Sequence, residues 1–417
     1  MASKAEGRVV YDLLIKGGHV LDPATDTDAI LDIGIVGGSI VALASDLDSA
    51  EASSVMEIRG NQRYVVPGLI DMHTHVAHGA TTLGVGMACC DPDTIGVKSG
   101  VTTVVDCGSV GVANIGVFPA HILKTAQTRV ICYLNVGSFA HTMPGHADIN
   151  ALSDVNQDAI AKCIESNPGL VKGFKLRVVG PIMAERGEEL VRASKAVAVE
   201  HHLPLMVHIG DSEAAGYKDP GQISALTRFV LGTLTEGDVL THLCTPHVGG
   251  VMDAEHRLVP ELKEARSNGV VLDPALGRGN FGYEVAMVQA QLGLHPDTIS
   301  SDLTVFGQSF HCLLECMSKF MAIGYSLRDV VTMTTSAAAR AIGLQDKLGE
   351  ISVGREADLS IIDVVDGAFQ FVDTAGTVFR GSKALVPVHT VRKGEPVVPG
   401  WGTHPWGWLP ANDTSAA

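Results

Sequence analysis

The sequence predicts an α/β protein, a (β/α)8 TIM barrel that carries a small β-sandwich built from the N- and C-terminal segments. In the middle of the chain, short apolar segments alternate with helix-like segments, a pattern that favours a parallel sheet. At both ends, short apolar strands are separated by Gly, Pro, Asp and Ser turns, without a helix of any length between them. The 417 residues are enough for both units.

The two ends of the chain share the texture of an all-β unit. Residues 10 to 60 contain "YDLLIKGGHVLDP", "ILDIGIVGGSIVALA" and "VMEIRG", and the last part contains "ADLSIIDV", "GAFQFVDTAG" and "KALVPVHTVRKGEPV". We therefore assign residues 1–65 to the first part of the β-sandwich, 66–347 to the barrel, and 348–417 to the second part of the β-sandwich with a C-terminal tail.

Eight segments between these flanks read as the barrel strands. They are "YVVPGLIDMHTH", "TTVVDCG", "VICYLNV", "LVKGFKLRVV", "LPLMVHIG", "DVLTHLC", "VVLDPA" and "ISSDLT". They span about 280 residues, close to the size typical of such a barrel. Stretches such as "ELVRASKAVAVEH" supply the helices between them.

Composition narrows the class of partner. Thirty basic against 46 acidic residues give a net charge of -16, which disfavours a polyanion, so we expect no nucleic acid. The sequence shows no secretion signal and no apolar run long enough for a membrane span, so we expect no membrane association. The eight cysteines are scattered, several of them within apolar runs, which favours a reducing cytoplasm. We expect a cytoplasmic homo-oligomer that acts on a small molecule.

Polar residues close several of the apolar strands, and His73 and His75 are the first of them. The ends of barrel strands are where active sites are built. Residues two apart lie on one side of a strand, so both imidazoles can reach one metal ion. An isolated pair of this kind is more often two hydrogen-bonded histidines of a polar core, and the rest of the chain has to decide between the two interpretations.

Lys175 in "LVKGFKLRVV" shares a strand face with Gly173, which leaves room for its side chain. A buried ammonium is costly and tends to lose its proton. The neutral amine can add CO2 and become a carbamate, whose two oxygens can bridge two metal ions. The alternative is an interior lysine that is ion-paired with Asp302.

His208, His242 and Asp302 close the fifth, sixth and eighth strands and complete a set of six candidate ligands. Imidazole nitrogens and carboxylate oxygens suit Zn²⁺, and other borderline divalent ions can substitute. Other histidines, such as His247, fall in loops or at helix ends, where we expect surface or capping roles. The full predicted ligand set is His73, His75, Lys175, His208, His242 and Asp302.

At this point the chain resembles the amidohydrolase superfamily of metal-dependent hydrolases. The resemblance runs from "LLIKGGHVLDP" through "VVPGLIDMHTH", "GVTTVVDCGS", "GFKLR", "MVHI", "THLC" and "ISSDL" to "LGEISVGREADLSIID". It is nearest to the amidohydrolase/deacetylase branch, close to dihydroorotases and D-aminoacylases. The resemblance implies that His73 and His75 hold the more buried metal with Asp302, that His208 and His242 hold the more exposed one, and that carbamylated Lys175 bridges both.

One departure from this pattern concerns the stretch after the seventh strand. Relatives tend to read like "DxGHGxGSFxF", whereas this chain reads "DPALGRGNFGYEV", with Leu276 where a histidine is expected. The ligand positions are unaffected. The difference bears on which substrate the chain accepts.

These observations predict a dinuclear zinc hydrolase of amide or ester bonds in small N-acyl or O-acyl compounds. Asp302 is the expected catalytic base, and Arg177 either binds a substrate carboxylate or pairs with a neighbouring acid. Further candidate substrate-binding residues are His141, Arg278, Asn280 and Tyr283. The alternatives are a cyclic amidase of the dihydroorotase or hydantoinase type, a mononuclear deaminase and a non-catalytic scaffold.

Overall fold

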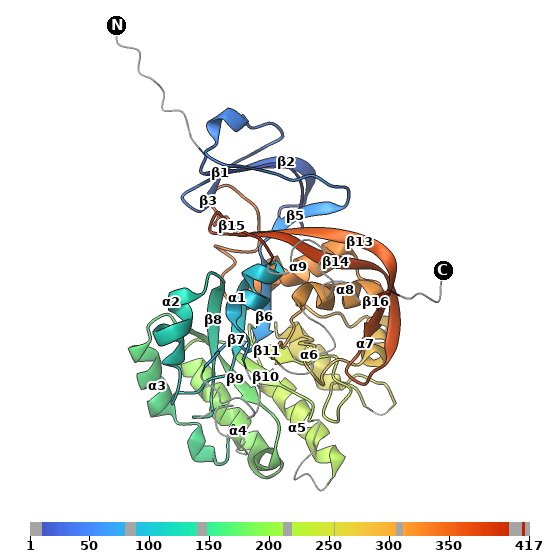
Figure 1. Cartoon of the computed structure of the whole chain (residues 1–417). Coiled ribbons are helices and arrows are strands. Elements are labelled where there is room, and N and C mark those ends of the chain that lie inside the picture. The colour runs from blue at the N-terminus through green and yellow to red at the C-terminus, as the bar shows by residue number, and fades with distance from the viewer. Residues whose placement is uncertain are drawn as a thin grey trace.

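The computed structural model describes residues 11–79, 89–138, 140, 148–211, 219–253, 255–305, 312–399 and 411–412. It has two parts, a curled parallel sheet with helices around it and a mixed sheet built from both ends of the chain (Figure 1). This is the predicted fold class, a TIM-like barrel with an added β unit.

The parallel sheet contains seven strands in consecutive order, so each strand pairs with the next one along the chain. The strands are β6 (Leu69–Thr74), β7 (Val101–Cys107), β8 (Arg129–Asn135), β9 (Val171–Arg177), β10 (Leu205–His208), β11 (Val239–Thr241) and β12 (Val271–Asp273). They are rich in β-branched and apolar residues and are almost entirely buried, as expected for a parallel sheet covered on both faces.

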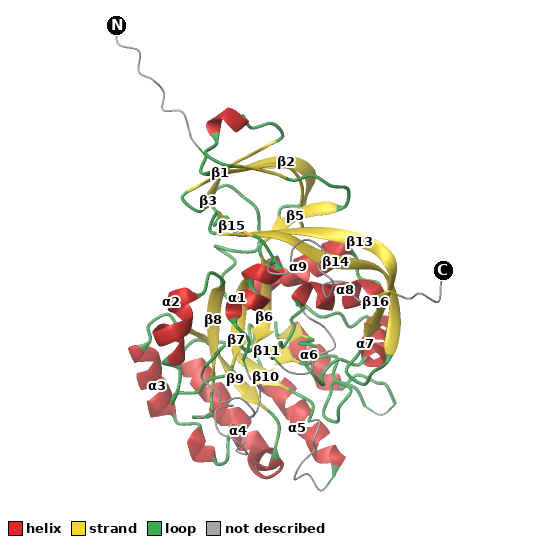
Figure 2. Ribbon diagram, viewed as in Figure 1, coloured by secondary structure: helices red, strands yellow, loops and turns green. Residues whose placement is uncertain are grey.

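Helices lie outside these strands (Figure 2). The longer ones are α3 (Gln157–Ser166), α4 (Pro181–Glu200), α5 (Pro220–Thr233), α6 (Pro260–Ser267), α7 (Tyr283–Gln291), α8 (Leu313–Ile323), α9 (Leu327–Thr334) and α10 (Ser336–Ala341). The short ones are α1 (Pro92–Ile95), α2 (Leu123–Thr125), the 3-10 turns η1 (Ser49–Glu51), η2 (Val97–Ser99) and η5 (Leu152–Asp154), and the π turn η3 (Phe118–Ile122). Several begin with proline in the first turn, where its missing N–H costs nothing.

The predicted eighth strand has no regular ladder, yet it links the two ends of the parallel sheet. The N–H of Thr298 donates to the carbonyl of Leu272 in β12, and the N–H of Asp302 donates to the carbonyl of His73 in β6. Asp302 has a φ of +54°, a left-handed conformation that interrupts an extended strand. Residues 298–303 therefore close the ring without a regular strand, through hydrogen bonds to β12 and an isolated parallel bridge between Thr74 and Leu303, and turn the Asp302 backbone at the rim.

The mixed sheet has the order β15-β14-β13-β5-β1-β2-β3, with β4 on β1 and β16 on β13. Its strands are β1 (Leu13–Asp22), β2 (Thr27–Val36), β3 (Ser39–Ala44), β4 (Val55–Glu57), β5 (Arg63–Pro67), β13 (Leu359–Val372), β14 (Val378–Arg392), β15 (Glu395–Val397) and β16 (Ala411–Asn412). Because β5 pairs with both β1 and β13, it joins the two chain ends in one sheet.

Gly68 connects the mixed sheet to the barrel between β5 and β6. A Cβ at this position would lie 2.4 Å from Oγ1 of Thr102, so a side chain would not fit without a shift. The close approach lets the first barrel strand start directly after the mixed sheet, which fixes where the strand ends and where His73 lies.

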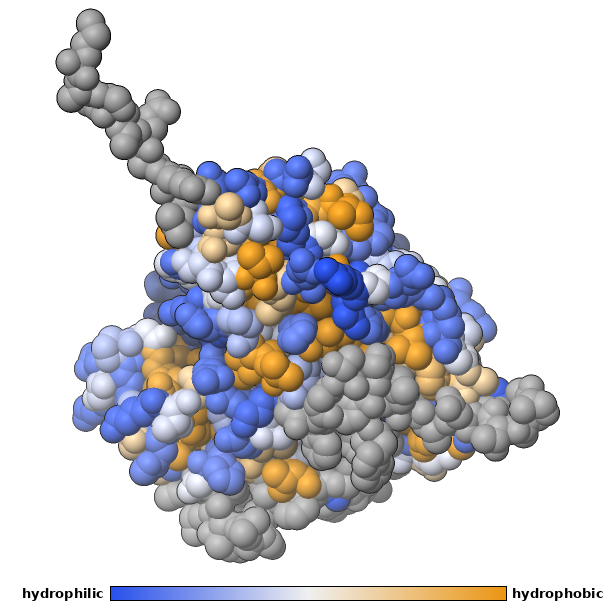
Figure 3. Space-filling view, turned by 45° about the horizontal axis from the view of Figure 1, so that its top comes forward, coloured by the Kyte–Doolittle hydropathy of each residue, from blue (hydrophilic) through white to orange (hydrophobic). Residues whose placement is uncertain are grey.

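The main apolar core joins the two parts, because it contains Phe174 of β9 together with Phe371 of β13 and Leu385 of β14. Smaller cores lie within each part. Residues such as Ile15, Ile33 and Ile361 form one core inside the mixed sheet, and Met72, Tyr133 and Met206 belong to a cluster of barrel-strand residues. All eight cysteines are free and buried. On the face shown in Figure 3, apolar residues are interspersed with polar ones. In the described part of the chain, none of the helices is both long and apolar enough to span a membrane.

Candidate metal centre

Five of the six predicted ligands lie at or next to the carboxyl ends of parallel strands, and Asp302 lies in the segment that closes the ring. His73 is in β6 and His75 follows it, Lys175 is in β9, His208 ends β10, and His242 follows β11. All six side chains are buried. His73, His242 and Asp302 each offer one ligand atom, and these atoms lie within 4.8 Å of one another.

Asp302 is in contact with the histidine pair. Its Oδ1 lies 3.0 Å from Nε2 of His75 and 3.5 Å from Nε2 of His73. Gly277 makes this position accessible, because a Cβ there would lie 2.3 Å from Oδ2 of Asp302. Burial alone would raise the pKa of the Asp302 carboxyl, but His73, His75 and His242 outweigh burial and lower it. Asp302 is thus an ionised carboxylate at the centre of the site.

Lys175 is buried beside His73 without an acidic partner. Its Nζ lies 2.9 Å from Nε2 of His73 and 3.6 Å from Sδ of Met206. Among the described residues, none places a carboxylate oxygen within ion-pair distance of this nitrogen, so the alternative of an ion pair with Asp302 is not observed. Burial lowers the pKa of Lys175. Gly108 gives its stem space, since a Cβ there would lie 2.7 Å from Cβ of Lys175.

His208 and His242 form the other side of the site. Their ring centroids are 4.1 Å apart, and the ring of His242 is 5.2 Å from that of His73. Nδ1 of His242 lies 2.8 Å from the carbonyl oxygen of Ala275, to which it donates, so its Nε2 is left as an acceptor. Burial lowers the pKa of His73 and His208 well below the usual value and that of His242 to about 4.

The site therefore combines four imidazoles, one carboxylate and one amine, and burial favours the neutral form of His73, His208, His242 and Lys175. Neutral imidazole nitrogens and carboxylate oxygens are the ligands that Zn²⁺ and similar divalent ions take in proteins. The donor set fits a divalent metal. If several of these histidines and Lys175 were protonated at once, their positive charges would repel one another at these distances.

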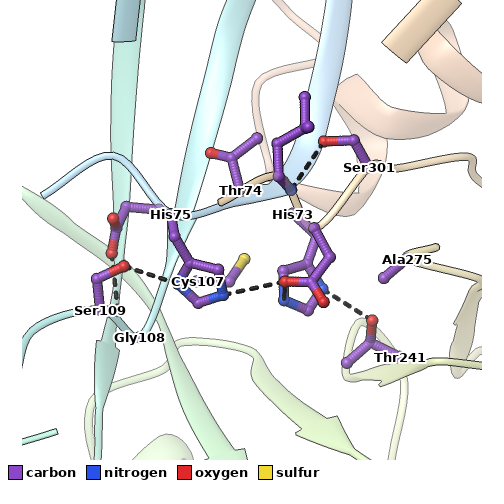
Figure 4. Close-up of polar contacts among 12 residues, drawn as sticks. His73, Thr74, His75, Cys107, Gly108, Ser109, Thr241, Ala275 and Ser301 are labelled. Carbon is purple, nitrogen blue, oxygen red and sulfur yellow. Dashed lines mark hydrogen bonds and ion pairs between the residues drawn. The ribbon is translucent and has the colours of Figure 1, made fainter. Parts of the chain in front are cut away.

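Buried hydroxyls and carboxylates that we did not predict surround the histidine pair. Nδ1 of His73 lies 2.9 Å from Oγ1 of Thr241, and Nδ1 of His75 lies 2.7 Å from Oγ of Ser109 (Figure 4). Three aspartates lie behind them: Asp71 accepts from the N–H of Ser301, Asp106 from that of Ser109, and Asp273 from the hydroxyl of Thr241. The signal was present in "IDMH", "VVDC" and "VLDP", where each aspartate is near the end of an apolar strand.

Arg177 lies in β9, two residues after Lys175, and its register partner in β10 is His208. Its Nη1 lies 3.5 Å from both carboxylate oxygens of Asp148, and about a quarter of the side chain is exposed. Asp148 is thus a neighbouring acid with which Arg177 forms a long ion pair. The Arg177 side chain therefore remains partly exposed at the barrel rim.

The remaining candidate substrate-binding residues lie in different surroundings. Arg278 is exposed, and Oδ1 of Asn280 lies 3.3 Å from Oγ1 of Thr245. Tyr283 begins α7 and stacks on Phe379 of the mixed sheet, with ring centroids 4.2 Å apart. His141 lies outside the described residues.

Leu276 occupies the position where the resemblance led us to expect a histidine. Its side chain is fully buried in the main apolar core. Its N–H donates to the carbonyl of Ser300, so its backbone helps to hold the segment that carries Asp302. An apolar residue thus replaces a polar group near the site.

Comparisons with known proteins agree with this geometry. Residues 64–397 match the family model described as the amidohydrolase family. A deacetylase of Brucella anthropi is 30% identical over 370 residues, which cover 88% of this chain and 87% of the relative. The crystal structure of an adenine deaminase has a TM-score of 0.81 at 26% identity and covers 93% of this chain and 100% of its own. That of a dihydroorotase has a TM-score of 0.77 at 26% identity, with coverage of 94% and 99%.

Proposed function

The chain belongs to the amidohydrolase family, and on this premise we propose that it is a dinuclear zinc hydrolase that cleaves amide or ester bonds of small N-acyl or O-acyl compounds. The observation that carries the proposal is Lys175, an amine buried beside His73 with no carboxylate partner among the described residues. A simple structural lysine would need a partner at this depth. The similarity to a deacetylase along most of both chains supports the reaction class.

Each donor has a role in this proposal. His73 and His75 would hold one ion with Asp302, and His208 and His242 would hold the other. The neutral amine of Lys175 would attack the carbon of CO2, so that an N–C bond forms, the electron pair of one C–O π bond moves onto oxygen, and one amine proton is released. The resulting carbamate would add two oxygen donors to the ligand set. When bound, such a pair of ions supplies an activated water and polarises the carbonyl under attack.

Asp302 is the residue we assign to proton transfer. Its low pKa keeps it ionised, and its contacts with His73 and His75 hold the carboxylate in place. It would accept the proton of the attacking water and deliver it to the leaving nitrogen or oxygen. Arg177, partly exposed at the rim, would bind a carboxylate on the substrate.

A cyclic amidase is the second candidate, and the similarity to a dihydroorotase structure favours it. Leu276 argues against assigning a relative's substrate to this chain, because a buried leucine cannot make the polar contacts of a histidine. A deaminase, which the similarity to the adenine deaminase structure suggests, is less consistent with a lysine at the position where two metals would be bridged. Each of the six ligand positions carries a residue that can bind a metal, which argues against a non-catalytic scaffold.

The test combines metal analysis with a substrate panel. We expect about two zinc ions per chain, loss of activity on chelation and recovery with zinc. The panel would contain N-acetyl and O-acetyl compounds with a carboxylate, cyclic imides and hydantoins, and adenine. Turnover of the acyl compounds alone supports the proposal, and turnover of the cyclic amides alone supports the second candidate. A fully active protein without bound metal would contradict both.

A further inference from the structure

His73 makes a hydrogen-bonded chain that leads away from the proposed metal centre. Its Nδ1 lies 2.9 Å from Oγ1 of Thr241, and Oγ1 of Thr241 lies 2.8 Å from Oδ2 of Asp273. These hydrogen bonds connect three barrel strands, from β6 through the end of β11 to the end of β12. Figure 4 shows Thr241 on the side of His73 that faces away from His75.

The direction of these hydrogen bonds follows from the protons available. Asp273 is fully buried and is surrounded by three hydroxyls, those of Thr241, Thr298 and Ser300, each 2.8 Å from a carboxylate oxygen. Burial raises the pKa of Asp273, and the hydrogen bonds from the three hydroxyls oppose this rise. The carboxyl oxygens accept from these hydroxyls, and each hydroxyl has one proton to donate. When Thr241 gives its proton to Asp273, its oxygen can only accept from His73.

This arrangement selects one tautomer of His73. The proton lies on Nδ1, and the lone pair of Nε2 points to the side where Lys175 lies at 2.9 Å and Asp302 at 3.5 Å. In the other tautomer, a bare Nδ1 would face the Thr241 oxygen, and the hydroxyl would have to abandon Asp273 to restore a hydrogen bond. The observed network therefore favours a ring that presents Nε2 as the ligand atom.

We propose that Thr241 and Asp273 are positioning residues that hold His73 as the Nδ1–H tautomer, with Nε2 ready to bind metal. The value of this tautomer for catalysis rests on the proposed function, whereas the tautomer itself does not. In many metal sites a carboxylate contacts the ligating histidine directly. Here the threonine hydroxyl lies between them, since Nδ1 of His73 is 3.9 Å from Oδ2 of Asp273.

His75 shows a similar arrangement on the other side. Its Nδ1 lies 2.7 Å from Oγ of Ser109, and the N–H of Ser109 donates to Oδ1 of Asp106 at 3.0 Å. Asp106 also accepts from the N–H of Val76 and Ala77, which follow His75 in the chain. Each imidazole of the pair is therefore hydrogen-bonded to a hydroxyl-bearing residue that in turn donates to a buried aspartate. The two aspartates come from different strands.

The decisive measurement uses the metal-free protein and does not depend on activity. Nitrogen-15 NMR of histidine-labelled protein distinguishes the two tautomers, and the His73 signals are identified by their loss in His73→Gln. We expect the Nδ1–H form for wild type and for Thr241→Ser, and an increased share of the other form for Thr241→Val. An Nε2–H form in the wild type would overturn the proposal, and this result needs no variant of Thr241 to fold.

Zinc affinity, measured by competition with a chelator, is the second readout. Thr241→Val should weaken zinc binding about 10- to 100-fold, and Thr241→Ser should recover most of it. Thr390→Val is the matched control, because Thr390 is also buried but lies in the mixed sheet, where it donates to the carbonyl of Val97. Equal losses in Thr241→Val and Thr390→Val would overturn the proposal. A wild type with the expected tautomer but no zinc affinity would contradict the proposed function alone.

Discussion

Nζ of Lys175 lies 2.9 Å from Nε2 of His73 at the centre of the barrel rim. At this distance the two groups cannot both be protonated, because two positive charges would repel each other in a buried site. Burial lowers the pKa of both groups. Burial therefore favours the neutral amine of Lys175, the form that the proposed carbamate requires.

Lys175→Ala tests that chemistry directly. If Lys175 is the carbamate bridge, the variant should lose metal and activity, since His208 and His242 alone are short of the three protein ligands usual for catalytic zinc. Acetate or propionate should restore part of both by filling the cavity with a carboxylate, and propylamine should not. Lys172→Ala, on the same strand but the other face, is the control. Rescue by the amine, or unchanged metal content, would mean that Lys175 is not the bridge.

Asp302→Asn separates metal binding from proton transfer. Asparagine tolerates the left-handed backbone at this position about as well as aspartate, so the rim should keep its shape. We expect much of the metal to remain and the turnover rate to fall at least about a hundredfold, the usual contribution of a positioned base. Metal analysis and steady-state kinetics on the same sample measure both. A metal-loaded variant with turnover near wild type would remove Asp302 from this role.

Gly277→Ala should displace the Asp302 carboxylate while leaving all six ligand residues unchanged in identity. The added methyl would meet Oδ2 of Asp302 at 2.3 Å, and a shift of this carboxylate by about 1 Å can cost on the order of a hundredfold in rate. Gly293→Ala is the control, because Gly293 also has a positive φ, +76°, but has nothing within 4 Å of its Cβ position. Backbone strain is thus common to both variants. Similar rates in the two would show that the contact with Asp302 is unimportant.

The lowered pKa of His242 predicts a pH-dependent stability of the metal-free protein. With a folded pKa of about 4 against an ordinary value of 6.5, the unfolded chain binds more protons between these values. His242 therefore costs stability as pH falls through this window, by roughly 2 kcal/mol between pH 7 and pH 5. Burial raises the pKa of Asp71 to about 7, which acts in the opposite direction, so the comparison must be made with His242→Gln.

Urea unfolding of both metal-free proteins at pH 7, 6 and 5 provides this comparison. Contributions of Asp71 and of the other histidines are common to the two proteins and largely cancel. The difference in free energy of unfolding, wild type minus His242→Gln, should become smaller as pH falls. A difference that stays constant across this range would contradict the lowered pKa of His242.

Arg177→Met tests the proposed carboxylate contact. Loss of a charge-assisted hydrogen bond should raise KM for N-acyl or O-acyl acids about 10- to 100-fold. Neutral esters with the same acyl group should be affected much less, and they serve as the control substrates. If both substrate classes lose activity equally, Arg177 is a structural partner of Asp148 and not a substrate-binding residue.

The sequence by itself was sufficient to predict the barrel and the rim at which its polar residues meet. Parallel strands place their carboxyl ends at one rim, so polar residues that close successive apolar segments must meet there. This reasoning brought His73, Lys175 and His242 into one site although they are far apart in the chain. It also predicted that both chain ends form one β unit, because each contains short apolar strands separated by turn residues, without a helix between them.

Only the tertiary structure decided how these groups are held. The left-handed backbone of Asp302, the approach of Gly277 and the hydroxyl of Thr241 beside His73 depend on contacts between segments that local periodicity does not relate. The stacking of Tyr283 on Phe379 of the mixed sheet likewise depends on how the two parts pack. Spacing along a chain determines which face a side chain takes, whereas hydrogen-bond partners are determined by which faces meet when the ring closes.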